Sequence, residues 1–177
     1  MVFVPRTTAP SATNKYYLVT RVGGYNECIE ISNGSALPNC VGYAWGRVYE
    51  YSLERPTLSR GNADGWWGYT QDGYERGSTP RLGAVICFDH PTSGGHVAVV
   101  EEIVDSNTIY TSESDYYGYR FMYRKRTNNG NWGQAAGYTF QGFIYPHNVT
   151  PPTPIDLKRG KFPWVLYARK FRDRNIV

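Results

Sequence analysis

The sequence predicts an α+β domain in which one early helix packs on an antiparallel β-sheet. Apolar side chains recur at spacings of three and four over residues 40–53, as they do on one face of a helix. Later in the chain, short segments rich in β-branched and aromatic residues are separated by turn residues, which is typical of strands. A helix followed by short strands joined by turns makes an α+β domain.

Length and composition indicate one globular domain. The chain has 177 residues, of which 41% are hydrophobic, 16% aromatic and 19% charged. This hydrophobic share excludes a disordered chain. The 19 Gly and 11 Pro favour turns and strands over a bundle of helices. We divide the chain into a flexible arm at residues 1–15, a domain at residues 16–149, and a linker with a short basic and aromatic segment at residues 150–177.

The segments before the helix are an arm, a strand and a loop. The arm is polar and rich in Pro, Thr and Ser. Residues 16–22 (YYLVTRV) predict a short strand, and residues 23–39 form a loop dense in turn residues. The helix begins after Asn39, because an Asn side chain can accept a hydrogen bond from an early free N–H group. Pro38 discourages an earlier start.

Five strands are predicted after a loop rich in Gly and aromatic residues at residues 59–80. They lie at residues 81–89, 96–105, 108–115, 121–127 and 138–146. Residues 150–155 (TPPTPI) are typical of a linker, and residues 160–177 predict a short amphipathic helix. The first residues hold no apolar stretch long enough for a signal peptide. No segment approaches the ~20 apolar residues of a membrane span.

Cys40 is the first candidate for chemistry. A helix N-terminus presents free N–H groups and about half a positive charge, which favours a thiolate there. The thiolate is the nucleophilic form of cysteine, and the same N–H groups can bind an oxyanion. The alternative is a small buried thiol, because free cysteine is among the most buried residue types.

The other two cysteines have weaker claims. Cys87 lies inside the apolar segment GAVICF and is expected in the core. Cys28 lies in a loop, where it is either partly buried or able to pair with Cys40 under oxidation. The odd number of cysteines argues against a disulfide framework, and without a Cys-x-x-Cys pair a structural zinc site is not expected.

His96 is the best placed of the three histidines. It opens an apolar strand after two glycines, which leave the approach to its ring uncrowded. His90 and His147 each adjoin a proline in a turn-like setting and are expected at the surface. A histidine at the start of a strand has either a structural role or that of a general base.

Hairpin geometry brings carboxylates to His96. If the loop at residues 106–107 has an even number of residues, the register places Tyr117 opposite His96 and Asp115 one diagonal step away. Glu113 shares this face, because residues two apart on a strand point the same way. An odd loop would present the alternate residues of the second strand instead. In the even register a carboxylate can orient the imidazole and stabilise its imidazolium form, as the third member of a triad does.

Aromatic side chains near these groups have two interpretations. The rings of Trp66 and Trp67 either line a groove for substrate or close the core beneath their loop. Asn39 and Tyr43 flank Cys40. We therefore expect Asn39, Tyr43, Trp66 and Trp67 to contact substrate.

The net charge of +4 is spread unevenly along the chain. Residues 123–126 (YRKR) and 157–174 hold much of the positive charge. Neither segment matches a nucleic-acid-binding module, so we expect a solvated basic face and no nucleic-acid partner. The mild basicity suits contact with an anionic polymer.

Six segments occur in an order and at spacings that resemble a known family. They are NCVGYAWGR, GNADGWWGY, RGSTPRLGAVICF, GGHVAVVEEI, TSESD and FQGFIYP. Together they resemble the CHAP domain, the cysteine- and histidine-dependent amidohydrolase/peptidase of bacterial and phage cell-wall lysins, over residues 16–147. The resemblance implies a papain-like α+β fold. In that fold the N-terminal helix carries the nucleophile and packs on an antiparallel sheet, and the substrate groove lies at the helix N-terminus.

The resemblance also implies roles for single residues. Cys40 matches the nucleophile, His96 the general base and Glu113 the acidic residue on the next strand. The residue two positions after this acid is usually Asn in the family, whereas this chain has Asp115, which can accept a hydrogen bond but cannot donate one. Glu113 and Asp115 both stay candidates for orienting His96.

The implied function is hydrolysis of amide bonds in peptidoglycan, as an endopeptidase or as an N-acetylmuramoyl-L-alanine amidase. Without a signal peptide, we expect a phage-encoded endolysin or tail-associated lysin that is made in the host cytoplasm. It would reach the wall after holin release or as part of a virion. A non-catalytic virion or wall-binding module that retains the fold is the alternative, and a cysteine protease acting on proteins is a third interpretation.

The thiol mechanism needs no metal or cofactor. Some members of the family bind calcium through an acidic loop ahead of the nucleophile. The matching region here has only Glu27 and Glu30 and lacks an Asp-rich ligand pattern, so structural calcium has no support. Bacterial peptidoglycan is the expected partner. The basic and aromatic segment at residues 157–174 either packs on the domain or docks on another phage tail protein.

Overall fold

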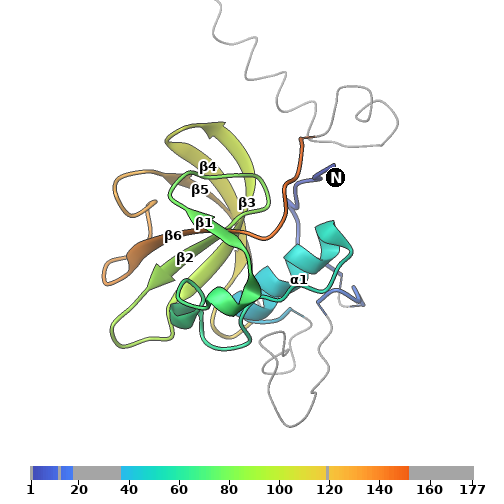
Figure 1. Cartoon of the computed structure of the whole chain (residues 1–177), viewed down its shortest axis with the longest axis horizontal. Coiled ribbons are helices and arrows are strands. Elements are labelled where there is room, and N and C mark those ends of the chain that lie inside the picture. Colours follow the sequence, from blue (N-terminus) through green and yellow to red (C-terminus); the bar gives the residue numbers. More distant parts are fainter. Residues whose placement is uncertain (1, 12, 18–36, 119, 152–177) are drawn as a thin grey trace, which may run out of the picture.

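A computed structural model describes residues 2–11, 13–17, 37–118 and 120–151 of the chain. Over these residues it has one α-helix and a six-stranded antiparallel sheet in the order β1-β6-β2-β3-β4-β5. The elements are α1 Cys40–Ser52, β1 Glu75–Gly77, β2 Val85–Asp89, β3 His96–Asp105, β4 Thr108–Ser114, β5 Phe121–Thr127 and β6 Thr139–Tyr145. Helix α1 lies against one side of the sheet (Figure 1). The predicted α+β class is confirmed.

Helix α1 begins where the sequence predicts it. The Asn39 side chain accepts a hydrogen bond from the Gly42 N–H at 3.0 Å, which caps the first turn. The helix ends at Leu53, whose φ of 62° is left-handed and whose N–H donates to the Tyr49 carbonyl. Cys40 is therefore the first residue of the helix.

Five of the six strands lie within segments that the sequence predicts as strands. The exception is β1, a three-residue strand inside the loop predicted at residues 59–80, which pairs with β6. Three residues are too few to show an alternating pattern. Of the strand predicted at residues 16–22, the first two residues lie in a turn and the rest falls outside the described residues. The helix predicted at residues 160–177 also falls outside them.

The sheet buries apolar side chains on both faces. Val97 and Val99 of β3 belong to the cluster that α1 covers, whereas Ala98 and Val100 belong to a second cluster on the opposite face. Side chains alternate along a strand, so His96 lies on the same face as Ala98. The two faces of β3 therefore have different tasks, one holding α1 and the other carrying His96.

A buried ion pair joins α1 to the sheet. The Arg47 guanidinium donates to both oxygens of the Glu101 carboxylate, at 2.8 Å and 3.0 Å. The Ser112 hydroxyl of β4 donates to the same carboxylate. Arg47 is 3% exposed and Glu101 is fully buried. Charges this deeply buried must be paired, so this contact sets the position of α1 on β3 and β4.

The described part of the predicted flexible arm packs on the domain. Phe3 is fully buried in the cluster that α1 covers, and its N–H donates to the Thr150 carbonyl at 2.9 Å. The Arg6 guanidinium binds the Glu50 carboxylate of α1. The two ends of the described domain consequently lie side by side (Figure 1). An aromatic ring and an ion pair thus hold a segment that we expected to be loose.

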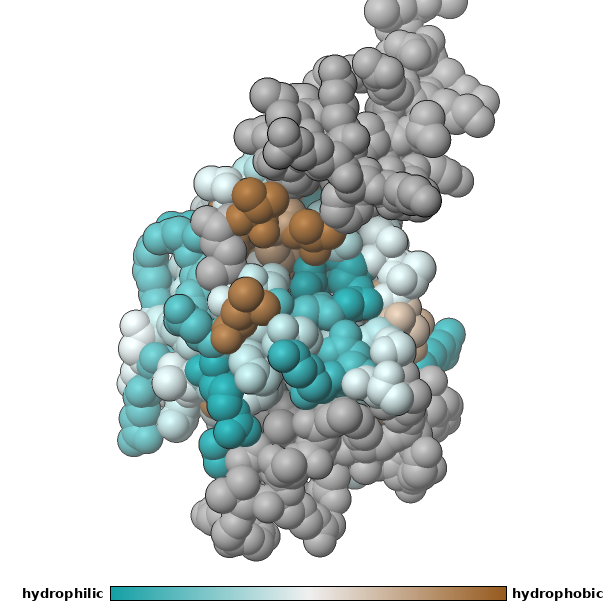
Figure 2. All heavy atoms as spheres, turned by 90° about the vertical axis from the view of Figure 1, so that its right-hand side faces the viewer, coloured by the Kyte–Doolittle hydropathy of each residue, from teal (hydrophilic) through white to brown (hydrophobic). Residues whose placement is uncertain are grey.

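The side of the molecule that carries the arm and the end of α1 is mostly hydrophilic. Figure 2 shows separate apolar spots among hydrophilic residues on this face. The exposed apolar side chains of Val2, Val4 and Leu53 belong to the arm and to the end of α1. No helix among the described residues has the length and apolar character needed to cross a bilayer.

Replacing Arg47 with Met tests the buried ion pair. The Glu101 carboxylate would stay buried without its partner, so we expect the free energy of unfolding in urea to fall by about 3–5 kcal/mol. Arg81→Met is the matched control, because Arg81 and Glu75 form an exposed pair and such pairs contribute little. Similar losses for the two variants would contradict this account.

Candidate active site

Cys40 occupies the positive end of α1. The Asn39 side chain uses the N–H group of Gly42, and the Asn39 carbonyl accepts from the Tyr43 N–H at 2.7 Å. The N–H groups of Cys40 and Val41 belong to the first turn and have no partner within the helix. Together with the helix dipole they can stabilise an anion on sulfur or on a nearby oxygen.

The ring of His96 lies between Cys40 and Glu113. Nε2 of His96 contacts the Glu113 carboxylate, and the ring is also hydrogen-bonded to Cys40. Since Nε2 faces Glu113, Nδ1 is the nitrogen left for Cys40. The Phe88 ring stacks on the imidazole at 6.5 Å and Tyr138 meets it edge-on at the same distance. The imidazole is thus held on both nitrogens and between two aromatic rings.

The two partners keep His96 protonated. Burial alone lowers the pKa of His96, but the hydrogen bonds and negative charges of Cys40 and Glu113 outweigh it and raise the pKa to about 9. At neutral pH His96 is therefore an imidazolium. An imidazolium next to a cysteine sulfur stabilises the thiolate, which is the nucleophile.

Glu113 is a buried carboxylate held by a buried arginine. Glu113 is 1% exposed, and Nη2 of Arg126 donates to both of its oxygens at 2.8 Å and 2.9 Å. Burial raises the pKa of Glu113, but the His96 hydrogen bond and the Arg126 charge prevail and lower it to about 2. This role of Arg126 is not among our predictions from the sequence. Arg126 lies in residues 123–126, where we expected a solvated basic face. In the sheet Arg126 pairs with Ile109 and Glu113 with Met122, so only their common face on neighbouring strands could have indicated the pair.

The register between β3 and β4 differs from the one we expected. Two one-residue shifts within residues 100–105 advance β4 by two positions along β3. Continued toward His96, the observed register brings Asp115 to the opposite position expected for Tyr117, and Glu113 to the diagonal one expected for Asp115. Two single shifts keep the parity of the strand, so the face was predicted correctly although the residue was displaced.

Asp115 shapes a turn rather than orienting the histidine. Its Oδ1 accepts hydrogen bonds from the N–H groups of Tyr117 and Gly118, at 3.2 Å and 3.1 Å. These described contacts lie within its own turn, whereas Glu113 contacts the ring of His96. The expectation that Asp115 orients His96 is therefore corrected, because its carboxylate is used in the turn.

The turn made by Asp115 presses on the chain just before Cys40. Gly118 has a φ of +76°, and a Cβ atom added to it would lie 2.6 Å from the Leu37 carbonyl oxygen and 2.9 Å from the Asn39 nitrogen. Only glycine allows both this conformation and this close approach. The turn consequently supports the segment that leads into the nucleophile.

Two of the aromatic side chains expected to contact substrate are in the core. Tyr43 and Trp66 are fully buried, and the Trp66 indole N–H donates to the Gly61 carbonyl. A fully buried ring cannot touch a substrate, so these two expectations are corrected. The interpretation of the Gly-rich loop as a core closure fits Trp66, and Trp67 is partly buried against the same core.

The remaining expected contacts and two unexpected side chains are more accessible. Asn39 is half-buried and its side chain caps α1. Tyr116 is 78% exposed and Tyr117 is 52% exposed, in the turn that supports the chain before Cys40. Neither tyrosine is among the substrate contacts predicted from the sequence, in which the end of β4 provides only candidate carboxylates.

The other cysteines lie away from this chemistry or outside the described residues. Cys87 is fully buried in the cluster that α1 covers, and burial raises the pKa of its thiol well above the usual range. This agrees with the core position expected for it. Cys28 falls outside the described residues.

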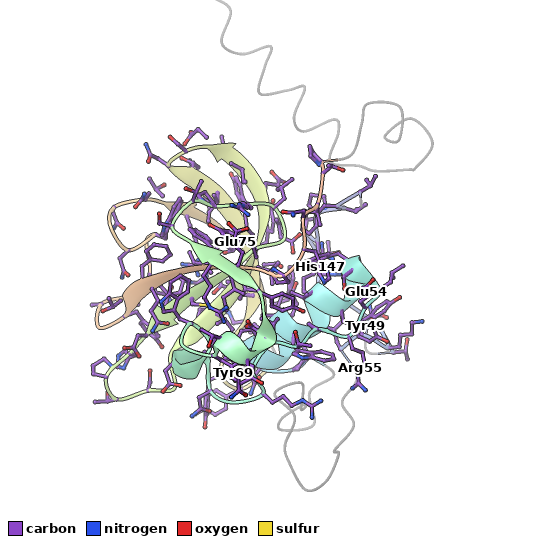
Figure 3. All side chains as sticks on the ribbon, viewed as in Figure 1. Tyr49, Glu54, Arg55, Tyr69, Glu75 and His147 are labelled. Atoms are coloured by element: carbon purple, nitrogen blue, oxygen red, sulfur yellow. The ribbon has the colours of Figure 1, made fainter. Side chains whose placement is uncertain are left out.

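The other two histidines are less exposed than expected. The His90 ring accepts hydrogen bonds in its own turn and lies 4.7 Å from the ring of Tyr138. His147 is half-buried beside α1 (Figure 3), with the rings of Tyr51 and Tyr74 each 6.1 Å away. Neither histidine has a described contact with Cys40 or Glu113.

In the part of the chain that the structure describes, no group of three or more His, Cys, Asp or Glu side chains has an arrangement that could hold a metal ion. Glu27 and Glu30, the acidic residues ahead of the nucleophile, fall outside that part. A surface hollow of about 660 Å³ is lined by residues 56–58, Arg60, Tyr69 (labelled in Figure 3) and Gln71. Cys40, His96 and Glu113 do not line it.

Gly118→Ala tests whether the Asp115 turn positions Cys40. We expect the added methyl group to displace residues 37–39 and to lower the rate of Cys40 alkylation by iodoacetamide about tenfold or more. Gly130→Ala is the matched control, because Gly130 also has a positive φ but has open space around a Cβ atom. The idea fails if both variants react at the wild-type rate.

The unfolding free energy should depend on pH through His96 and Glu113. Folding raises the pKa of His96 from 6.5 to about 9, so its stabilising effect is complete below pH 6.5 and is lost between pH 6.5 and 9. Folding lowers the pKa of Glu113 from 4.5 to about 2, so its effect is complete above pH 4.5 and is lost as the pH falls toward 2. Urea unfolding at pH 6 and pH 9 should show a loss in the wild type that His96→Asn lacks, and equal losses would refute the coupling.

Comparison with known proteins found two similarities. The family model of the CHAP domain matches residues 30–115, which include Cys40, His96 and Glu113. A crystal structure of an N-acetylmuramoyl-L-alanine amidase from Staphylococcus aureus is similar, with a TM-score of 0.47 and 24% sequence identity over 62% of this chain. The chain covers 30% of that amidase. The resemblance to the CHAP domain found in the sequence is thus confirmed over residues 30–115.

Proposed function

We propose that this chain hydrolyses amide bonds in bacterial peptidoglycan, with Cys40 as nucleophile, His96 as general acid and base, and Glu113 as the group that orients His96. The observation that carries the proposal is the His96 ring, which is hydrogen-bonded to Cys40 on one side and to a buried, ionised Glu113 on the other. The CHAP domain match supports the class of enzyme.

In the proposed reaction, the Cys40 thiolate attacks the carbonyl carbon of the scissile amide. The electron pair of the C=O bond moves to oxygen, and the N–H groups of Cys40 and Val41 donate to this oxyanion. The His96 imidazolium then gives its proton to the amide nitrogen. The C–N bond breaks, the amine leaves, and the acyl group stays on Cys40 as a thioester.

Water completes the proposed cycle. Neutral His96 takes a proton from water as the oxygen attacks the thioester carbon. The C–S bond breaks, the carboxylic acid product leaves, and Cys40 returns as a thiolate beside the His96 imidazolium. Glu113 stays ionised throughout and holds the ring in the orientation that both proton transfers need.

The bond cleaved is either the amide between muramic acid and L-alanine or a peptide bond of the stem or bridge. The exposed Tyr116 and Tyr117 beside the site would be among the first side chains to meet the substrate. As a setting, we propose a phage-encoded endolysin or tail-associated lysin that is made in the host cytoplasm. It would act on the wall after holin release or from the virion, without a metal or cofactor.

Cys40→Ala should remove at least about 10³-fold of the activity, because the oxyanion donors and binding alone leave only a small residual rate. The assay is clearing of purified cell walls, and mass analysis of the fragments separates an amidase from an endopeptidase by the new termini. Cys87→Ala is the matched control and should clear walls at close to the wild-type rate, since Cys87 lies in the core. Equal clearing by Cys40→Ala and the wild type would overturn the proposal, and a Cys40 inert to alkylation would favour a wall-binding module.

A further inference from the structure

Arg126 is the least expected charged side chain near the site. It lies on β5 and is 2% exposed, and each nitrogen of its guanidinium has a hydrogen-bond partner. Its contacts are both oxygens of Glu113, the Thr111 hydroxyl at 2.9 Å, the Gln134 amide oxygen at 3.1 Å, the Trp132 carbonyl at 3.3 Å and the face of the Phe88 ring at 5.1 Å. A guanidinium bound through all three nitrogens in this way is held in one orientation.

Charges alternate from the nucleophile to this arginine. In the reactive state Cys40 is an anion, His96 a cation, Glu113 an anion and Arg126 a cation, so the chain of four has no net charge. Without Arg126, the buried site would carry a net charge of −1. An unpaired charge in a buried site is costly, and a carboxylate in that position tends to take up a proton instead.

We propose that Arg126 is a positioning residue for the reaction, which keeps the Glu113 carboxylate ionised and fixed in the orientation that His96 requires. The proposal rests on the proposed function, because it gives a task to the third member of the same site. Nη2 donates to both oxygens of Glu113, while Nε and Nη1 anchor the guanidinium on other groups. A lysine could supply the charge but not these additional donors, which hold the cation in place.

The groups that face the site are few among the described residues. Glu113 is faced by His96 from β3 and by Arg126 and Arg124 from β5. His96 is faced by Cys40 from α1 and Glu113 from β4, with the uncharged rings of Phe88 and Tyr138 on its sides. Arg124 lies 3.6 Å from Glu113 but is 47% exposed, so solvent screens its charge.

Removing a buried cation raises the pKa of each acidic group near it. In Arg126→Met, Glu113 therefore takes up a proton at a higher pH, and His96 holds its proton to a higher pH, because the repulsion from Arg126 is gone. This sign agrees with the charge of Arg126 being among the causes that lower the pKa of Glu113 in the intact protein. The whole pH profile of Cys40 reactivity should therefore move to higher pH.

The test measures the rate of Cys40 alkylation by iodoacetamide against pH, followed by mass spectrometry of the peptide that contains Cys40. We expect Arg126→Met to move both limbs of this profile, the rise at low pH and the change at high pH, to higher pH by about 1 unit or more. Arg126→Lys keeps the charge and should leave the limbs in place while lowering the rate of wall hydrolysis about 10- to 100-fold. Arg124→Met is the matched control and should shift the limbs by less than about 0.3 unit.

Several results would overturn the proposal. A lower rate with unmoved limbs in Arg126→Met would mean that Arg126 is only structural, and an equal shift in Arg124→Met would mean that the effect is not specific. If both Arg126 variants fail to fold by circular dichroism, the ¹³C signal of the Glu113 carboxyl in the wild type decides. It must stay that of an ionised group down to about pH 3, and titration near the ordinary value would refute the role.

The alkylation assay uses no peptidoglycan, so it separates this inference from the proposed function. If the wild type leaves cell walls intact but the pH profile of Cys40 alkylation shifts in Arg126→Met, peptidoglycan is excluded as the substrate and the positioning role of Arg126 is supported. If the wild type clears walls but the pH profile does not shift in Arg126→Met, the proposed function is supported and the positioning role of Arg126 is refuted.

Discussion

The structure depends on burying two carboxylates in one sheet without leaving either unpaired. Glu101 and Glu113 each lie within 1% of full burial, and each is bound by an arginine that is itself buried. A lone carboxylate in either place would cost several kcal/mol or would be protonated. Arg47 pairs with Glu101 on the α1 side of the sheet, and Arg126 pairs with Glu113 on the opposite side.

These two pairs set the geometry of the site from different directions. The Arg47–Glu101 pair locates α1 on the sheet, and so determines where the sulfur of Cys40 lies. The Arg126–Glu113 pair locates the acceptor for Nε2 of His96, and so determines how the ring is turned. Each reacting group is on a regular element whose position a buried ion pair helps to fix, which keeps a site precise.

The local sequence pattern was enough to predict much of the active-site arrangement. The helical spacing and Asn39 located Cys40 at a helix start, and strand parity placed Glu113 on the face of His96. Two features could not be predicted from the sequence, because they depend on tertiary structure. The two bulges in β3 follow from how the strands twist and pair, and no residue type in the sequence indicates them. The burial of Arg126 inverts the ordinary preference of arginine for solvent, and it is visible only once β4 and β5 are paired.

The bridge between Val2 and Thr150 has a bearing on how the domain folds. It joins the first and last described segments of the domain, so its contact order is among the highest that the chain permits. Closing so long a loop is slow, and the Arg6 N–H of the arm, which donates to Glu101 of β3, can form this bond only once the arm has docked. We therefore expect the arm to dock last during folding and to open first under native conditions, as a separate unit of hydrogen exchange at Phe3. The arm would then detach from the C-terminal end of α1 and dock again, while the active site at the N-terminal end of the helix stays folded.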